Sequence, residues 1–426
     1  MRNEHILAVD VGGSALRVGL VNADGTIAAS SAVALRIEEP RAGWAELDPE
    51  AWWQAFLRAS GRVLRGAPKV AAVCVCALTR TQVLLDRNGG ALGRAMLFRD
   101  RRAGFDAPAR LAWIERHQPA RFAKIAHVVE PKDYLNFRLT GVIADASASP
   151  PWRQVGSVRA LARLAGVPVF GGAMDTWASA VGAGAVEPGQ AYDVAGTTEA
   201  VGLLTALPVD ARGLRALPWT ETAHQIGGPT QAGADCALWC HDTFRVRGSL
   251  ADAIARIGPA LREDAPVFLP YLAGERAPVW SSGVRGAFHG VDRAHAPDDF
   301  LWSVMEGVAH AVRDILTIAQ SAANVRAHEL RACGGGAKAD AWCALKADVL
   351  GLPVIRSRAA ETGLVGAAMA AAVGLALYPD LRSAALRMAK PGRRFAPRAR
   401  YAKSYERRAG LYAAVKRHAL ELSDDT

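Results

Sequence analysis

Cysteine is scarce in this sequence of 426 residues, and its spacing excludes the usual cysteine chemistry. The six cysteines stand at 74, 76, 236, 240, 333 and 343, and no pair has the spacing of a zinc finger or of a C-x-x-C redox motif. Cys236, Cys240 and His241 come nearest to a metal cluster. Reduced and mostly buried thiols are the better interpretation, and they are typical of a cytoplasmic protein.

Long hydrophobic runs are also missing, and the sequence predicts no secretory leader. The longest weakly polar run, "GLVGAAMAAAVGLALY" at 363–378, is rich in Ala and Gly and predicts a packed helix rather than a membrane span. The first residues, "MRNEHILAVD", lead directly into an apolar strand. These patterns predict a cytoplasmic protein with no membrane partner.

Motifs for nucleic-acid binding do not accompany the basic charge. The formal charge is +10, from 51 Lys and Arg against 41 Asp and Glu, and such an excess suits either nucleic acid or a phosphorylated ligand. No finger, basic zipper or aromatic RNA motif is present. We therefore expect no nucleic-acid partner, and we interpret the arginines as a solvated basic face or as a compositional habit of the source.

The order of apolar segments predicts an α/β protein with two domains. A chain of this length exceeds one ordinary hydrophobic core. Strands are expected at 6–10 and 69–78, a hairpin at Asp24-Gly25, and helices at 49–64, 108–118 and 131–139, the first with Asp48 as N-cap and Pro49 at its first position.

A second block of strands begins near Tyr192 and repeats the opening. The segment "YDVAGTTEAVGLLT" has the form of "ILAVDVGGSALRVGLV": an apolar strand, a turn of glycine and hydroxyl residues, and another apolar strand. The repeat predicts domains 1–188 and 189–426, with the last helix able to pack back on the first, and the α/β halves facing one another across a cleft.

Glycine turns after apolar strands are the candidate phosphate sites. Gly12, Gly13 and Ser14 can present backbone N–H groups to phosphate oxygens, Asp10 can hold Mg²⁺ through water, and Arg17 can neutralise phosphate charge. A second turn has Gly196, Thr197 and Thr198. The first turn could equally be a plain hairpin turn, and the second, taken alone, is a weak indication of a phosphate site.

A third turn and a charged stretch complete the set. Gly334, Gly335, Gly336 and Ala337 allow backbone to approach a flat ligand, although a tight strand-to-helix turn explains them as well. In "YLAGERAPVW", Glu275 and Arg276 taken alone would indicate an exposed charged loop.

Asp175 is a lone carboxylate among small and apolar residues in "GGAMDTWASAVGAG". Its charge is costly to desolvate, so it is a helix N-cap, a group with a chemical task, or both, since a cap position is also a cleft position.

Together these stretches resemble the FGGY carbohydrate kinases of the actin-like ATPase superfamily and, among them, the xylulokinases. The resemblance also includes "AGWAELDPEAWW", "EPKDYLNFRLTG" and "GGGAKADAW". It implies two actin-like (ribonuclease H-like) ATPase domains that close on ATP, Mg²⁺ and a sugar or polyol, and relatives of this kind are often homodimers. It also implies that Asp175 is the general base, that the first two turns bind phosphate, and that residues 334–337 bind adenosine.

The sequence departs from the family's usual pattern around the acceptor. Arg80 replaces a common His, Phe98-Arg99 a common Trp-Asn, and Thr176 a common Asn, whereas Asp100 is kept. On the resemblance, Arg80, Phe98, Asp100, Asp175 and Thr176 would contact the acceptor.

Further departures concern the phosphates and the length of the chain. Gly13 replaces a Thr, and Glu199 stands where a small residue is usual, so its carboxylate would repel a triphosphate unless turned away or bound to metal. Segments also look lost near "FRDRRAGFDAPARLAW" and "DASASPPWRQVG". The alternative to a xylulokinase-like kinase is therefore an inactive relative that binds sugar or ATP as a regulator. An actin-like or chaperone-type ATPase lacks support, because no peptide-binding extension is present.

Overall fold

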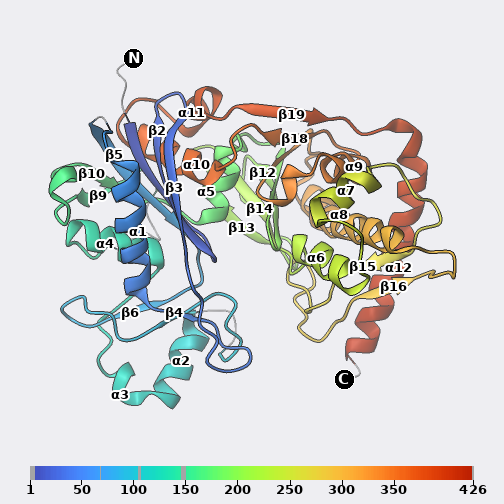
Figure 1. Ribbon diagram of the computed structural model, residues 1–426, viewed down its shortest axis with the longest axis horizontal. Coiled ribbons are helices and arrows are strands. Elements are labelled where there is room, and N and C mark those ends of the chain that lie inside the picture. The colour runs from blue at the N-terminus through green and yellow to red at the C-terminus, as the bar shows by residue number, and fades with distance from the viewer. Residues whose placement is uncertain (1–4, 68, 104–106, 145–149, 425–426) are drawn as a thin grey trace. The chain divides into compact units, whose positions relative to one another are not determined.

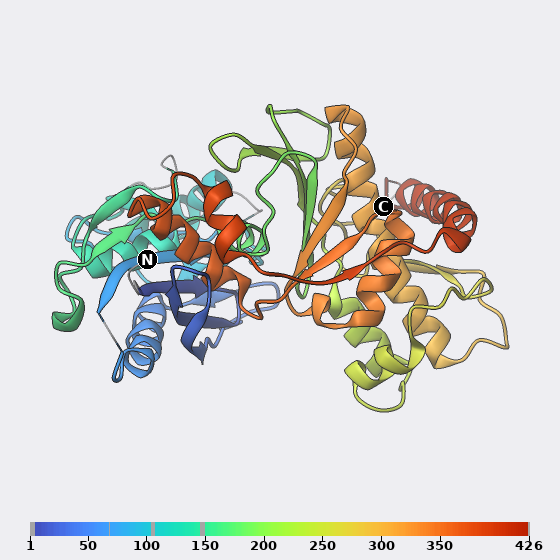
Figure 2. The same ribbon diagram turned by 90° about the horizontal axis from the view of Figure 1, so that it is seen from above.

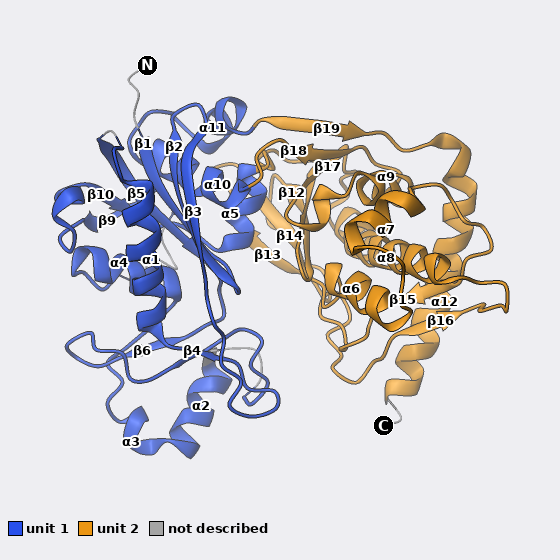
Figure 3. Cartoon of the chain, viewed as in Figure 1, with its two compact units in different colours: residues 1–182, 361–389 blue, residues 183–360, 390–426 orange. Residues whose placement is uncertain are grey.

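The computed structural model describes residues 5–67, 69–103, 107–144 and 150–424, and the chain forms two compact units. The first unit contains residues 1–182 and 361–389, and the second contains residues 183–360 and 390–426 (Figure 3). The chain therefore leaves the first unit after Gly182, where the sequence suggested residue 188, and returns to it later. The returning segment is 361–389, not the last helix of the chain.

The first unit is built on a six-stranded sheet of order β3-β2-β1-β5-β10-β9. The strands are β1 (His5–Val11), β2 (Ala15–Asn22), β3 (Ile27–Ala34), β5 (Val70–Ala77), β9 (Gln154–Ser157) and β10 (Pro168–Phe170). Strands β1, β5 and β10 run parallel, while β2, β3 and β9 are antiparallel to their neighbours. The predicted hairpin at Asp24-Gly25 is confirmed. Gly25 has a φ of +82°, and a Cβ there would lie 2.1 Å from the carbonyl oxygen of Met388.

Helices cover both faces of this sheet. Helix α1 (Pro49–Val63) begins as predicted, with the Asp48 carboxylate accepting the Glu50 N–H. Helices α5 (Asp175–Gly182) and α10 (Thr362–Gly374) pack against each other, and α10 also packs on β1 and β5. Figures 1 and 2 show α1 and α10 on opposite sides of the strands.

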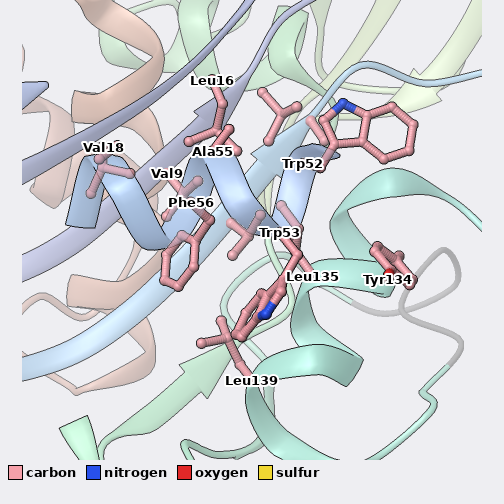
Figure 4. Close-up of a cluster of buried hydrophobic side chains, with 14 of the residues drawn as sticks. Val9, Leu16, Val18, Trp52, Trp53, Ala55, Phe56, Tyr134, Leu135 and Leu139 are labelled. Carbon is pink, nitrogen blue, oxygen red and sulfur yellow. The ribbon is translucent and has the colours of Figure 1, made fainter. Parts of the chain in front are cut away.

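The side chains of β1 point alternately to the two faces of the sheet, and those on the α1 side form a core with that helix. Val9, Leu16 and Val18 meet Trp52 and Phe56 of α1 there (Figure 4). All five side chains are fully buried. The intervening residues of β1 point to the α10 side, and Asp10 is one of them.

The remaining elements of the first unit are short. They are β4 (Glu46–Leu47), β6 (Val83–Leu85), β7 (Ala95–Met96), α2 (Ala107–His117), α3 (Pro119–Phe122), β8 (His127–Val129), α4 (Pro131–Thr140), η1 (Ala162–Leu164) and α11 (Leu381–Met388). Strand β4 pairs with β7, and β6 pairs with β8. The expected shortened segments include residues 104–106 and 145–149, which lie outside the described residues.

The second unit repeats the design with a seven-stranded sheet of order β13-β14-β12-β11-β17-β18-β19. Its strands are β11 (Gln190–Ala195), β12 (Glu199–Thr205), β13 (Arg215–Pro218), β14 (His224–Pro229), β17 (Glu329–Cys333), β18 (Val354–Ser357) and β19 (Pro391–Phe395). As in the first unit, a parallel set, here β11, β17 and β18, continues from an antiparallel meander. The predicted repeat is thus present in the strand order.

Helices and a small hairpin complete the second unit. They are α6 (Ala234–Thr243), α7 (Leu250–Ile257), β15 (Val267–Leu269), β16 (Ala287–His289), α8 (Pro297–Ala323), η2 (Gly336–Lys338), α9 (Asp340–Leu350), η3 (Ala399–Tyr401) and α12 (Ala402–Asp424). The last helix, α12, packs on α8, α9 and β15 of its own unit.

The helices of the described chain include none with the length and apolarity needed to cross a membrane. All six cysteines are buried and free, as the sequence predicted.

Candidate active site

The carboxyl ends of β1, β5 and β10 meet at one edge of the first sheet and bring three predicted residues together. The Leu78 N–H donates to the Val11 carbonyl at 2.8 Å, and the Ala77 N–H donates to the Ala173 carbonyl at 3.1 Å. Because these strands are parallel, the residues that follow them lie side by side. Asp10, Arg80 and Asp175 are therefore neighbours, although the chain separates them widely.

Asp10 is a nearly buried carboxylate, 8% exposed, at the end of β1. Burial and the nearby Asp175 raise the pKa of Asp10 to about 7, against a lowering effect of Arg17. Its Oδ1 atom has no hydrogen-bond partner among the described residues. An uncompensated oxygen of this kind, beside a glycine turn, suits a hard divalent cation such as Mg²⁺.

The predicted phosphate turn follows Asp10 directly. The Gly12 N–H donates to the Ala15 carbonyl at 3.0 Å and closes the turn, while Ser14 is exposed. Arg17, opposite Asp10 across the β1–β2 pair, forms an ion pair with Glu361 at 3.0 Å.

Asp175 begins helix α5 and is half-buried. Its Oδ1 accepts the Thr176 N–H at 2.7 Å and the Thr176 hydroxyl at 3.4 Å. An N-cap would instead accept from the second or third helical residue, so the cap interpretation does not fit this geometry. Burial raises the pKa of Asp175, and the charge of Arg80 acts against that rise.

The predicted acceptor residues Arg80 and Phe98 lie near this carboxylate and the phosphate turn. Arg80 follows β5 in a left-handed backbone conformation with a φ of +54°. The Phe98 ring is 3.7 Å from the position a Cβ on Gly13 would take, and the Phe98 N–H donates to the Thr81 hydroxyl. The two departures at 13 and 98 are therefore neighbours in space.

Asp100 is placed differently from a direct acceptor ligand. It is 1% exposed, and its carboxylate accepts the Ala45 N–H at 2.8 Å and the guanidinium and N–H of Arg102. The Arg102 side chain lies over the Trp44 ring, 3.4 Å from its centre, and also pairs with Glu46. This arrangement makes Asp100 a support for the surrounding loop.

The two glycine turns of the second unit pack on each other at the ends of β11 and β17. A Cβ on Gly334, whose φ is +90°, would lie 2.4 Å from the Ala195 carbonyl oxygen. The Gly196 carbonyl accepts the Ala234 N–H at 3.1 Å, which ties the 196–198 turn to the start of α6. The turns at 196–198 and 334–337 are therefore close neighbours.

The charged stretch after residue 270 is buried, which contradicts the interpretation of it as an exposed loop. Glu275 is 4% exposed and Arg276 is 8% exposed. Arg276 donates to the Thr198 hydroxyl at 3.0 Å and also to the Thr230 carbonyl. It therefore supports the predicted phosphate turn at residues 196–198.

Glu199 is turned away from that turn, into the protein. Lys346 of α9 donates to Glu199 at 2.7 Å and to Asp193 at 2.5 Å, and the three side chains are between 0 and 5% exposed. Burial and Asp193 raise the pKa of Glu199 well above its ordinary value. The expected repulsion of a triphosphate is thereby removed.

A cavity of about 800 Å³ adjoins the glycine turn at 334–337. Leu250, Ile254, Trp342 and Phe395 supply apolar lining, and Gly335 and Gly336 supply backbone. The volume and apolar walls suit a purine nucleoside.

Two residues of this site were not predicted from the sequence. Glu361 pairs with Arg17, and Gly363 lies so close to Asp10 that a Cβ there would be 2.5 Å from Asp10 Oδ2. The clustering of glycine and alanine in "ETGLVGAAMAAA" was the available signal for a close approach. This pattern predicts a closely packed helix, but it does not show that the helix packs against Asp10.

Comparison with known proteins shows the class. Sequence models of the FGGY family of carbohydrate kinases match residues 5–105 with the N-terminal domain and residues 191–375 with the C-terminal domain. The chain belongs to this family and is a carbohydrate kinase.

Within this family, the chain is similar to xylulose kinases. A xylulose kinase of Bacillus subtilis is 25% identical over 99% of this chain and 98% of its own length. A xylulose kinase of Escherichia coli is 29% identical over 81% of this chain and 84% of its own length. The proteins named here are all kinases, and they lend no support to the alternative of an inactive regulator.

A solved structure of similar fold is the ligand-bound xylulose kinase of Lactobacillus acidophilus. It has a TM-score of 0.89 at 20% identity and covers 99% of both chains. A gluconate kinase of the same organism has a TM-score of 0.88 at 21% identity, covering 97% of this chain and 98% of its own. These structures establish the two-domain actin-like, ribonuclease H-like fold.

Proposed function

We propose that this kinase transfers the γ-phosphoryl group of ATP to a hydroxyl of a small sugar or polyol, with Asp175 as general base. A pentulose such as xylulose is the leading acceptor. The observation that carries the proposal is the convergence of Asp175, Asp10 and Arg80 at the carboxyl edge of the first sheet, beside a glycine turn.

The contacts of Asp175 support the role of base. Thr176 holds one oxygen of the carboxylate, Oδ1, through both its N–H and its hydroxyl. The other oxygen, Oδ2, would accept the proton of an acceptor hydroxyl as the hydroxyl oxygen attacks phosphorus. The raised pKa of Asp175 makes its carboxylate a better proton acceptor.

Charge neutralisation and positioning supply most of the remaining rate in phosphoryl transfer. Asp10 and the 12–14 turn would hold the metal–phosphate end of the nucleotide, and the Gly196–Thr198 turn is the other candidate for a phosphate contact. Mg²⁺ at Asp10 would offset the charge that develops on the transferring group. The cavity beside Gly335 would take the adenosine, and Trp342 and Phe395 would exclude water from its adenine ring.

A coupled ADP-release assay over pentuloses, hexuloses, polyols and aldonates tests the proposal. One acceptor should stimulate ATP use, and Asp175→Asn should lower kcat by about 10²–10⁴ while calorimetry still shows ATP binding. Asp86→Asn is the matched control, because Asp86 accepts N–H groups in a turn and an amide oxygen can do the same. Wild-type turnover by Asp175→Asn would refute the role of Asp175. Acceptor binding without any phosphoryl transfer would instead favour a regulator.

A further inference from the structure

Arg80 has an unusual backbone conformation for a residue with a side chain. Its φ is +54°, in the left-handed region that favours glycine. Such conformations persist where the surroundings hold them, and they cluster at functional sites. Arg80 directly follows the sheet edge where Asp175 lies, so its conformation decides where its guanidinium points.

Two buried or half-buried side chains hold the backbone of Arg80 from both sides. The Arg80 N–H donates to Glu130 Oε1 at 2.9 Å. Arg110, which is 1% exposed, donates to the Arg80 carbonyl and, at 3.1 Å, to Gln82 Oε1. Glu130 immediately precedes helix α4, and Arg110 belongs to α2, so both anchors come from other elements.

Glu130 is itself costly to place there. Burial raises its pKa, and the charges of Asp133 and Asp175 act in the same direction, while the Arg80 N–H and the charge of Lys132 oppose the rise without cancelling it. A hydrogen bond to a single backbone N–H does not require a carboxylate in such surroundings. Its cost suggests that the conformation of Arg80 matters to the reaction.

The guanidinium of Arg80 acts on the same region. Its charge lowers the pKa of Asp175, which places it within electrostatic reach of the base. An arginine presents five N–H donors in a fixed fork, so a small change in its backbone moves all the donors that could meet acceptor oxygens.

We propose that Glu130 is a positioning residue that fixes the backbone of Arg80, and thereby sets how the guanidinium contacts the sugar or polyol. Arg110 holds the opposite peptide group. This inference rests on the proposed function and adds to it a residue that acts on acceptor recognition and has no part in holding ATP.

A double-mutant cycle with Arg80→Gly and Glu130→Ala tests the inference. Glycine adopts a φ of +54° without strain and removes the guanidinium. The probe is D-xylulose, or the panel member with the highest kcat/KM. Glu130→Ala should raise KM for the acceptor about tenfold, which corresponds to about 1.4 kcal/mol, because the guanidinium is no longer oriented. It should leave KM for ATP within about twofold. Glu130→Gln should stay near wild type, because the amide oxygen still accepts the N–H.

The decisive comparison is the effect of Glu130→Ala when Arg80 is already glycine. If Glu130 acts through Arg80, the double variant should match Arg80→Gly in its acceptor KM. An equal loss in both backgrounds, or an equal rise in KM for ATP, would overturn the inference, as would a Glu130→Gln variant as weak as Glu130→Ala. The Asp175→Asn variant is run alongside: acceptor-dependent activity that it abolishes upholds the proposed function whatever Glu130 does. A chain that uses no acceptor refutes both.

Discussion

Replacing Lys346 by methionine should destabilise the second unit strongly, because it removes the cation shared by two buried carboxylates. Lys346 contacts Asp193 at 2.5 Å and Glu199 at 2.7 Å, and none of the three side chains is more than 5% exposed. Removing one partner of a buried ion pair typically costs about 3–5 kcal/mol, because the remaining charge is left uncompensated. We expect a loss of this size in Lys346→Met.

The loss should also depend on pH with a definite sign. Lys346 lowers the pKa of Glu199, so without the ammonium group burial and the charge of Asp193 raise the folded-state pKa of Glu199 still further above the unfolded value. Stability from such groups is present below the unfolded pKa and is lost as pH rises through the folded pKa. The deficit of Lys346→Met relative to wild type should therefore be larger at pH 8 than at pH 5.

Hydrogen exchange of the β11 and β12 amides measures this free energy in the unit concerned. At pH 8, their protection factors should fall by about 10²–10⁴, which corresponds to the expected loss. The triple variant Asp193→Asn, Lys346→Met, Glu199→Gln is the matched control and should recover the larger part, because no buried charge remains. A loss below about 1 kcal/mol, as for an exposed ion pair, or a deficit equal at both pH values, would refute the reasoning.

Two glycines of the site give further predictions. Gly363→Ala should lower both kcat and thermal stability, since its Cβ would lie 2.5 Å from the Asp10 carboxylate; Gly410→Ala in α12, where nothing lies within 4 Å, should raise Tm slightly. Equal behaviour of these two variants in kinetics and thermal melts would contradict the close packing. Gly335→Ala, whose Cβ would also meet nothing within 4 Å, should keep Tm but raise KM for ATP severalfold, because the turn adjoins the nucleoside cavity. An unchanged KM for ATP would place the adenosine elsewhere.

Local patterns were sufficient to predict much of the secondary structure. Asp48 and Pro49 marked the start of α1, and Asp24-Gly25 marked the β2–β3 turn, because capping and turn chemistry involve residues adjacent in the chain. The similarity between the two strand-turn-strand segments likewise predicted two sheets of one design. These features depend on interactions over a few residues, which a sequence displays directly.

Contacts between segments far apart in the chain could not be predicted from the sequence. The sequence alone predicted that the Glu199 carboxylate would repel a bound triphosphate unless turned away or bound to metal. Its partner Lys346 comes from a helix far along the chain, so the ion pair could not be predicted. Asp100 looked like an acceptor ligand, yet Arg102 and the Ala45 N–H occupy its oxygens. The return of 361–389 to the first unit was also not predicted, because an Ala- and Gly-rich helix carries no mark of the sheet it will cover.

That return has a consequence for how the protein is made. Strands β1 and β5 leave the ribosome early, but the helix that covers their Asp10 face is not synthesised until residues 362–374. A fragment ending near residue 182 would expose this apolar face, and it should need residues 361–389, supplied in the same chain or as a separate peptide, to become soluble. Chaperones would meet the nascent chain while the face of its first sheet that α10 later covers is still exposed, which lasts for more than half of its synthesis.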